Sequence, residues 1–200
     1  MKLFTNNAAI RLNMIDADVT YFPEFLSSQE ADALFKELLE HTPWQQDDIT
    51  VFGKTHKQPR LTALYAYNEK TYSYSNITMV PHNFNKELLN IKSRIENKVH
   101  EVFTTCLLNL YRDGTDSNGW HADDEKELGV NPIIASLSLG AERLFHFKHK
   151  YNTDLRERLI LKHGSLLLMK GATQHNWLHQ IPKTKKPIRK RINLTFRIIH

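Results

Sequence analysis

The chain has 200 residues, of which 40% are hydrophobic and 24% charged, as in an ordinary soluble globular protein. No apolar run approaches the ~20 residues of a membrane helix, and the N-terminal segment lacks the apolar stretch of a secretory signal. Cys106 is the only cysteine, which excludes an internal disulfide and fits a reducing, cytoplasmic setting. The net charge of +5 favours an anionic partner but does not identify one.

Two amphipathic helices are predicted in the first half of the chain. Residues 27–41 place Ser27 and Glu30 at capping-box spacing, ahead of an apolar stripe with helical period. Residues 85–103 carry a second stripe, which includes Val102 on the side expected to be buried.

Short strands are predicted in the rest of the chain. Residues 50–80 have the composition of short strands and loops, and after residue 104 several β-rich segments are separated by turn signals. Many short strands without intervening helices argue for an antiparallel sandwich, jelly roll or barrel. The predicted fold is therefore mainly β (α+β), with the N-terminal helices packed on a β core. The later strands are expected at residues 106–112, 132–140, 143–150, 158–164, 165–170 and 191–199.

A metal site is suggested by the segment 118–125, "NGWHADDE". A histidine two residues before an acid is expected about once by chance in a chain with 11 His and 22 acidic residues, so a hydrated loop is the alternative. If the segment is extended, His121 and Asp123 share one face and can chelate one ion. A second histidine, His175 or His179, would complete the two-histidine, one-carboxylate set of non-heme Fe(II) oxygenases. Zinc hydrolases use similar ligands, but their H-E-x-x-H signature is absent.

An anion site is suggested by the last predicted strand, whose apolar and polar residues alternate. On a surface strand its two arginines would lie in water, whereas in a barrel they could bind a dicarboxylate through charge-assisted hydrogen bonds. The arginines are ~20 Å apart along the backbone, so both reach one small acid only if their side chains converge. The same alternation places Asn109 and Tyr111 together. The polar positions of the last strand are Arg191, Asn193, Thr195 and Arg197.

With these motifs in order, the chain resembles the AlkB family of Fe(II)- and 2-oxoglutarate-dependent nucleic-acid dealkylases. The motifs are "LLNLYRDG", "WHADDE", "PIIASLSLGAERLFHF", "LKHGSLLLM", "WLHQIP" and "RINLTFR", over roughly residues 105–198. "QPRLTALY" and "TYSYSN" extend the likeness back to about residue 58. The resemblance implies a double-stranded β-helix, or jelly roll. We expect one dioxygenase domain over residues 1–200, with a helical and substrate-lid extension at 1–104 and a catalytic core at 105–198.

The resemblance also implies a role for individual residues. The implied iron ligands are His121, Asp123 and His179, with His179 favoured over His175. The residues implied to bind 2-oxoglutarate are Asn109, Tyr111, Arg191, Asn193 and Arg197. The residues implied to contact the substrate base are Tyr72, Tyr74, Asp124 and Arg60. The chain departs from the family in having Ala122 between the ligands and no clear base-flipping finger, for which Val51 and Phe52 are candidates.

The activity implied is the oxidative demethylation of bases such as 1-methyladenine and 3-methylcytosine in DNA, a direct-reversal repair. The implied cofactors are Fe(II), 2-oxoglutarate and O₂, and the products include succinate and formaldehyde. The expected partner is methylated DNA, held at phosphates by the basic segments 53–57 and 183–191, with no membrane contact. We expect a monomer in the cytoplasm, or in the nucleus of a eukaryote. The alternatives are an RNA demethylase, a protein-directed dioxygenase, a non-catalytic nucleic-acid-binding module and a structural cupin-like protein.

Overall fold

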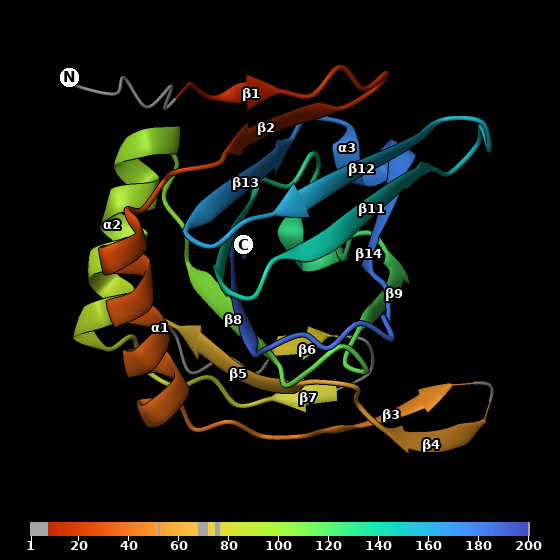
Figure 1. Ribbon diagram of the computed structural model, residues 1–200. Coiled ribbons are helices and arrows are strands. Elements are labelled where there is room, and N and C mark those ends of the chain that lie inside the picture. Colours follow the sequence, from red (N-terminus) through yellow and green to blue (C-terminus); the bar gives the residue numbers. More distant parts are fainter. Residues whose placement is uncertain (1–7, 52, 68–71, 75–76, 200) are drawn as a thin grey trace.

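The computed structural model describes residues 8–51, 53–67, 72–74 and 77–199, and for residues 50, 51, 72–74, 77 and 78 it describes the backbone only. Two antiparallel sheets face each other across the centre of the molecule (Figure 1). The seven-stranded sheet has the order β1 (Ile10–Arg11), β2 (Asp18–Phe22), β13 (Ser165–Lys170), β10 (Ile134–Gly140), β15 (Arg191–Arg197), β8 (Thr105–Tyr111), β5 (Leu61–Ala66). The four-stranded sheet has the order β12 (Arg156–Leu161), β11 (Arg143–His149), β14 (Trp177–Ile181), β9 (Asn118–His121).

Two small hairpins and two short helical segments complete the described chain. The hairpins pair β3 (Asp48–Val51) with β4 (Lys54–Lys57) and β6 (Tyr72–Tyr74) with β7 (Ile77–Met79). The short segments are the 3-10 turn η1 (Lys126–Leu128) and the helix α3 (Thr173–Asn176). These elements confirm the predicted class, a mainly β jelly roll. Strands β2 and β5, which precede residue 104, belong to the same sheet as β8 and β15.

Two amphipathic helices cover one face of the seven-stranded sheet, α1 (Ser28–His41) and α2 (Lys86–Val99) (Figure 1). The predicted capping box begins α1, because Ser27 Oγ accepts from the Glu30 N–H and the Glu30 carboxylate accepts from the Ser27 N–H. The second helix is shorter than predicted. It ends at Val99, because His100 is left-handed with φ of 61°. Val102 therefore leaves the helical stripe and is 70% exposed, so the prediction that it is buried was wrong.

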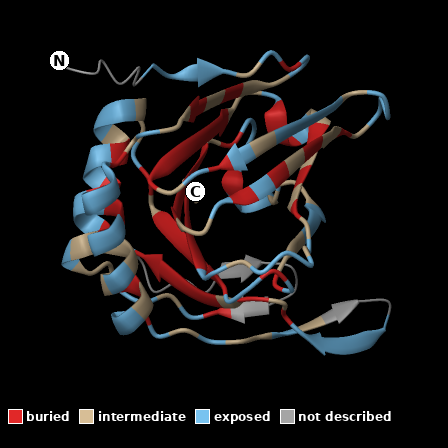
Figure 2. Ribbon diagram, in the orientation of Figure 1, coloured by how far each residue is buried: buried red, intermediate tan, exposed pale blue. Residues whose placement is uncertain are grey.

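The core has two main parts, one on each side of the seven-stranded sheet. One cluster joins that sheet to the helices, and the other fills the space between the two sheets. Figure 2 shows the central strands of the seven-stranded sheet buried along their length, whereas buried residues alternate with exposed or half-buried ones along β11. In the described part of the chain, no helix has the length and apolar character needed to span a membrane.

Candidate metal centre and anion pocket

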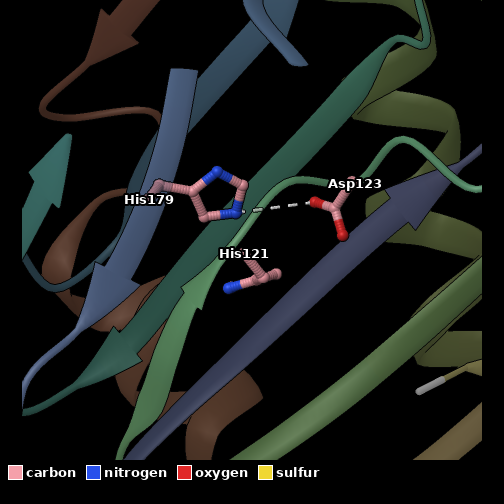
Figure 3. A group of neighbouring side chains, drawn as sticks. All are labelled: His121, Asp123 and His179. Carbon is pink, nitrogen blue, oxygen red and sulfur yellow. Dashed lines mark ion pairs between the residues drawn. The ribbon is translucent and has the colours of Figure 1, made fainter. Parts of the chain in front are cut away.

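Three side chains with metal-ligating atoms meet between the sheets (Figure 3). His121 is the last residue of β9, its cross-strand partner His179 lies on β14, and Asp123 follows β9 by two residues. One ligand atom from each residue lies within 4.8 Å of the other two. The rival His175 lies apart from this group, on α3, where its Nε2 accepts from the backbone N–H of Asn131. The structure therefore brings together the three residues that the resemblance favoured.

The charge states of the three side chains suit a divalent cation. Burial lowers the pKa of His121 and lowers that of His179 to about 3, so both imidazoles are neutral at pH 7. Burial alone would raise the pKa of Asp123, but Arg197 and the two histidines outweigh it and the pKa is lowered. The 3.7 Å contact in Figure 3 thus joins a neutral His179 ring to the Asp123 carboxylate. Two neutral imidazoles and one carboxylate can bind a transition metal without first losing protons.

Hydrogen bonds hold these candidate ligands in place. His121 Nδ1 donates to the Gly119 carbonyl at 2.8 Å, so Nε2 carries the lone pair; that lone pair accepts from Asn118 Nδ2 at 3.1 Å and would exchange this donor for a metal. The Asp123 backbone N–H donates to Oε1 of the fully buried Gln174 at 3.0 Å, and Arg197 Nη2 donates to Asp123 Oδ1 at 2.5 Å. Gln174 was missed from the sequence, because a glutamine in a four-residue helix belongs to no pattern.

A pocket beside the triad is lined by the polar face of β15 together with residues of β8 and β10. All seven residues of β15 are buried, which excludes the alternative of a surface strand with its arginines in water. Both arginines line the same pocket, as they must if both are to reach one acid. The polar residues of these three strands that line the pocket are Asn109, Tyr111, Ser136, Arg191, Asn193, Thr195 and Arg197.

The state of Arg191 indicates that the pocket is built for an anion. Its Nη2 donates to Ser138 Oγ at 2.9 Å, and its guanidinium lies over the Tyr111 ring at 5.1 Å. Within the described part of the chain, its Nε and Nη1 have no hydrogen-bond partner. Burial, opposed by Tyr111 and reinforced by Arg143, lowers the pKa of Arg191 to about 10, so it stays charged at pH 7. A buried cation with unpaired N–H groups is costly, and a carboxylate would satisfy it.

The residues expected to contact a substrate base are more scattered. Asp124 is exposed, and its carboxylate pairs with Lys150 Nζ at 2.8 Å. Arg60, expected at the rim of the pocket, is only 4% exposed and donates to Asn109 instead. Tyr72 and Tyr74 belong to β6, for which only the backbone is described.

The candidates for a base-flipping finger fall in the first hairpin. Val51 ends β3, and its side chain lies outside what the structure describes. Phe52 lies outside the described residues altogether.

Comparisons with known proteins agree with this geometry. The family model "2OG-Fe(II) oxygenase superfamily" matches residues 18–197. The chain is 42% identical over 191 residues to alpha-ketoglutarate-dependent dioxygenase alkB homolog 3 of Homo sapiens, which covers 91% of this chain and 66% of that protein. It is 37% identical over 200 residues to DNA oxidative demethylase ALKBH2 of Bos taurus, which covers 95% of this chain and 71% of that protein.

A solved structure described as "The structure of OsALKBH1" matches with a TM-score of 0.69 at 15% identity, over 96% of this chain and 100% of that one. At that identity the likeness concerns the fold alone, and it agrees with the jelly roll described above.

The chain belongs to the 2OG-Fe(II) oxygenase superfamily and, within it, to the AlkB family. This confirms the membership predicted from the motifs, and Fe(II), 2-oxoglutarate and O₂ are the cofactors of such an oxygenase. The donor set fits them, because His121, Asp123 and His179 offer metal ligands and Arg191 offers unpaired N–H groups to a carboxylate. The chain spans 65% and 66% of the length of the bovine and human alkB homolog 3 relatives, a little under two thirds.

Proposed function

We propose that this chain is an Fe(II)- and 2-oxoglutarate-dependent dioxygenase that demethylates N-alkylated bases in DNA, such as 1-methyladenine and 3-methylcytosine. The observation that carries the proposal is the meeting, in one buried pocket, of a two-histidine, one-carboxylate group and an arginine with unpaired N–H groups. The relatives named above add the substrate class, since one of them is called a DNA oxidative demethylase.

In this proposal, His121, Asp123 and His179 hold the metal. Arg191 binds the distal carboxylate of 2-oxoglutarate, helped by Asn109, Tyr111 and Asn193. When bound, the metal with 2-oxoglutarate and O₂ supplies the oxidation of the N-methyl carbon, so that the acid leaves as succinate and CO₂ and the methyl group leaves as formaldehyde.

Arg197 has two tasks in the proposed site. It lines the pocket that would hold the acid, and it donates to Asp123 Oδ1. That hydrogen bond fixes one oxygen of Asp123 and leaves Oδ2, which lies 3.7 Å from His179, for the metal. Arg197 therefore links the proposed cosubstrate site to the proposed metal site.

The methyl group of such a base lies on its pairing edge, so the base must leave the stack, and a lesion that weakens pairing lowers that cost. We assign stacking on the flipped base to Tyr74, assisted by Tyr72, which would contribute ~1–3 kcal/mol. Asp124 supplies a negative charge that attracts a cationic methylated base. The protein would act as a monomer on DNA in the cytoplasm, or in the nucleus of a eukaryote.

A cationic outer face of the four-stranded sheet supports a nucleic-acid partner. In the cross-strand pairs, Lys148 lies opposite Arg156 and His146 opposite Arg158. Within the described part of the chain, none of Lys148, Arg156 and Arg158 forms an ion pair. Beside them Trp120 is 39% exposed, with Lys148 Nζ 4.5 Å from its ring centre. Like charges on neighbouring strands repel, whereas phosphates would neutralise them and a base could stack on the indole.

The predicted basic segments also remain candidates for phosphate contact. The four residues of β4, Lys54–Lys57, are exposed, as are the lysines of the segment 183–190. Arg191 belongs to the basic segment 183–191 predicted from the sequence. It is buried in the pocket, so it is not available to phosphates.

The test is formaldehyde release from methylated single-stranded DNA, duplex DNA and RNA, compared under controlled Fe(II) and 2-oxoglutarate. We expect release from DNA that requires both additions, with one succinate per formaldehyde. Faster release from RNA would favour the RNA demethylase instead. Binding of DNA with no turnover on any of the three would favour the non-catalytic module.

A further inference from the structure

The side-chain amide of Asn109 has two faces, and which one meets the pocket decides whether it attracts or repels a carboxylate. An amide offers N–H donors on one side and an oxygen acceptor on the other, and the two orientations have nearly the same shape. Packing therefore cannot choose between them, and the choice must come from hydrogen-bond partners.

Arg60 is the partner that makes this choice. It is 4% exposed and immediately precedes β5, whose Thr62 is the cross-strand partner of Asn109. Its Nε donates to Asn109 Oδ1 at 2.8 Å, and its Nη1 donates to the Ser117 carbonyl at 3.3 Å. A guanidinium has five N–H donors and no acceptor, so it can face only the oxygen of the amide.

The direction imposed by Arg60 continues across the sheet. With its oxygen turned to Arg60, Asn109 directs Nδ2 toward Asn193 Oδ1, at 3.5 Å on the neighbouring strand. Asn193 Oδ1 also accepts from the Thr195 hydroxyl at 3.0 Å. Its Nδ2 then donates to Ser136 Oγ at 2.8 Å. In this series of hydrogen bonds, each side chain from Arg60 to Asn193 donates an N–H to the oxygen of the next, and the series ends at Ser136.

The result is a pocket wall made of donors. Asn109 keeps a second N–H that is not used toward Asn193, and Ser136, which accepts from Asn193, keeps its own O–H to donate. Both residues line the pocket, next to the unpaired N–H groups of Arg191. If Asn109 turned over, its oxygen would face both the pocket and Asn193 Oδ1.

We infer that Arg60 is a positioning residue that fixes the direction of this hydrogen-bond chain, so that Asn109 and Ser136 present donors to a dicarboxylate. Arg60 thus acts behind the pocket wall, in place of the substrate-base contact expected from the sequence. The inference rests on the proposed function, in which that dicarboxylate is 2-oxoglutarate.

The test compares Arg60→Met, which removes the donor, with Arg60→Lys, which keeps one. The measurement is calorimetric binding of 2-oxoglutarate to protein loaded with Mn(II), together with the affinity for Mn(II) itself. We expect Arg60→Met to weaken 2-oxoglutarate binding about 10-fold, from one misdirected charged hydrogen bond, while Arg60→Lys stays within about threefold of the unmodified protein. The affinity for Mn(II) should not change.

Lys92→Met is the matched control, because Lys92 is also a buried cation but belongs to α2 and pairs with Glu96, which does not line the pocket. It should lower stability and leave 2-oxoglutarate binding as it was. Equal binding by Arg60→Met and the unmodified protein would overturn the inference alone. Equal losses in Arg60→Met and Arg60→Lys, or a parallel loss of Mn(II) affinity, would also overturn it. Failure of the unmodified protein to bind 2-oxoglutarate would overturn the proposed function as well.

A double-mutant cycle with Asn109→Ala tests whether Arg60 acts through Asn109. Asn109→Ala removes the amide that Arg60 directs, so it should weaken 2-oxoglutarate binding by itself, and adding Arg60→Met should cause no further loss. Unchanged binding by Asn109→Ala would overturn the inference even if Arg60→Met does not fold. Additive losses would show that Arg60 does not act through Asn109.

Discussion

The two sheets of this molecule use their faces differently. The central strands β8 and β15 of the seven-stranded sheet are buried on both faces, between the helices and the other sheet. In the four-stranded sheet, buried residues of β11 alternate with exposed or half-buried ones, so one face is inside and the other is open in part to solvent. Polar groups on the first sheet are therefore withdrawn from water and must find partners inside the protein or in a ligand.

This difference separates two kinds of chemistry. The seven-stranded sheet supplies donors, above all Arg191, that suit an anion. The four-stranded sheet supplies the imidazoles of His121 and His179, which suit a cation. The hydrogen bond from Arg197 on β15 to Asp123 joins the two. Changes on one sheet should thus affect one ligand, whereas changes at the junction should affect both.

The largest effect is expected at the junction, from Asp123→Ala. This change removes a candidate metal ligand together with the carboxylate partner of Arg197, and breaking such a buried pair costs about 3–5 kcal/mol. Demethylation should be abolished, as it should be in His121→Ala. The measurement is formaldehyde release in a metal-controlled assay, with Asp123→Asn as the control that keeps the side-chain shape. Full demethylation by Asp123→Ala would refute the metal assignment.

On the seven-stranded sheet, Arg191→Met should weaken 2-oxoglutarate binding about 100-fold by removing charge-assisted hydrogen bonds. Its ligand-free form should melt at a higher temperature than the unmodified protein, because a buried cation with two unpaired N–H groups is gone. Arg143→Met is the contrast. Arg143 is equally buried, but it donates to the carbonyls of Asp113, Asp116 and Pro182, so its loss should lower the melting temperature. Melting curves and calorimetry check both, and a destabilised Arg191→Met would count against the account.

On the four-stranded sheet, burial of neutral His179 should make the metal-free protein less stable as the pH is lowered. The pKa of His179 is lowered from 6.5 in the unfolded chain to about 3 in the folded one, so between these values the unfolded state holds the extra proton. Stability is then fully present above pH 6.5 and decreases below it, by about 2 kcal/mol at pH 5. Urea unfolding at several pH values measures this, and His179→Asn should flatten the dependence. An unchanged slope in that variant would contradict the assignment.

The smallest effect is expected on the outer face of the same sheet. Arg156→Gln combined with Arg158→Gln should weaken binding of a single strand of DNA about 10-fold and lower the salt slope by about 1.4 for two lost phosphate contacts. Lys36→Gln with Lys86→Gln removes the same charge from the exposed sides of α1 and α2 and should change neither. Fluorescence anisotropy at several salt concentrations distinguishes the pairs. Equal losses in both pairs would mean that net charge, rather than this face, attracts DNA.

Much of the fold could be predicted because its signals are local. The capping box at Ser27 and the apolar stripe of residues 27–41 are complete within the segment itself, and they placed α1 to within one residue. The alternation in residues 191–199 likewise revealed the polar face of β15. Such patterns predict where an element begins and which of its faces carries polar residues.

The strands that carry the candidate ligands were harder to predict. Strands β9 and β14 are short, and they exist because β14 pairs with β9 on one side and with β11 on the other. Gln174 and Arg60 form hydrogen bonds with residues 51 and 49 positions away along the chain. No local pattern encodes such contacts, so only the resemblance could favour His179 over His175, and nothing pointed to Gln174.

Anaerobic calorimetry tests the separation of the two sites most directly. Fe(II) is titrated first and 2-oxoglutarate second, into the unmodified protein, His179→Ala and Arg191→Met. We expect one Fe(II) and one 2-oxoglutarate per unmodified chain, loss of Fe(II) binding in His179→Ala, and retention of Fe(II) with weakened acid binding in Arg191→Met. Normal Fe(II) binding by His179→Ala, or unweakened acid binding by Arg191→Met, would contradict this separation.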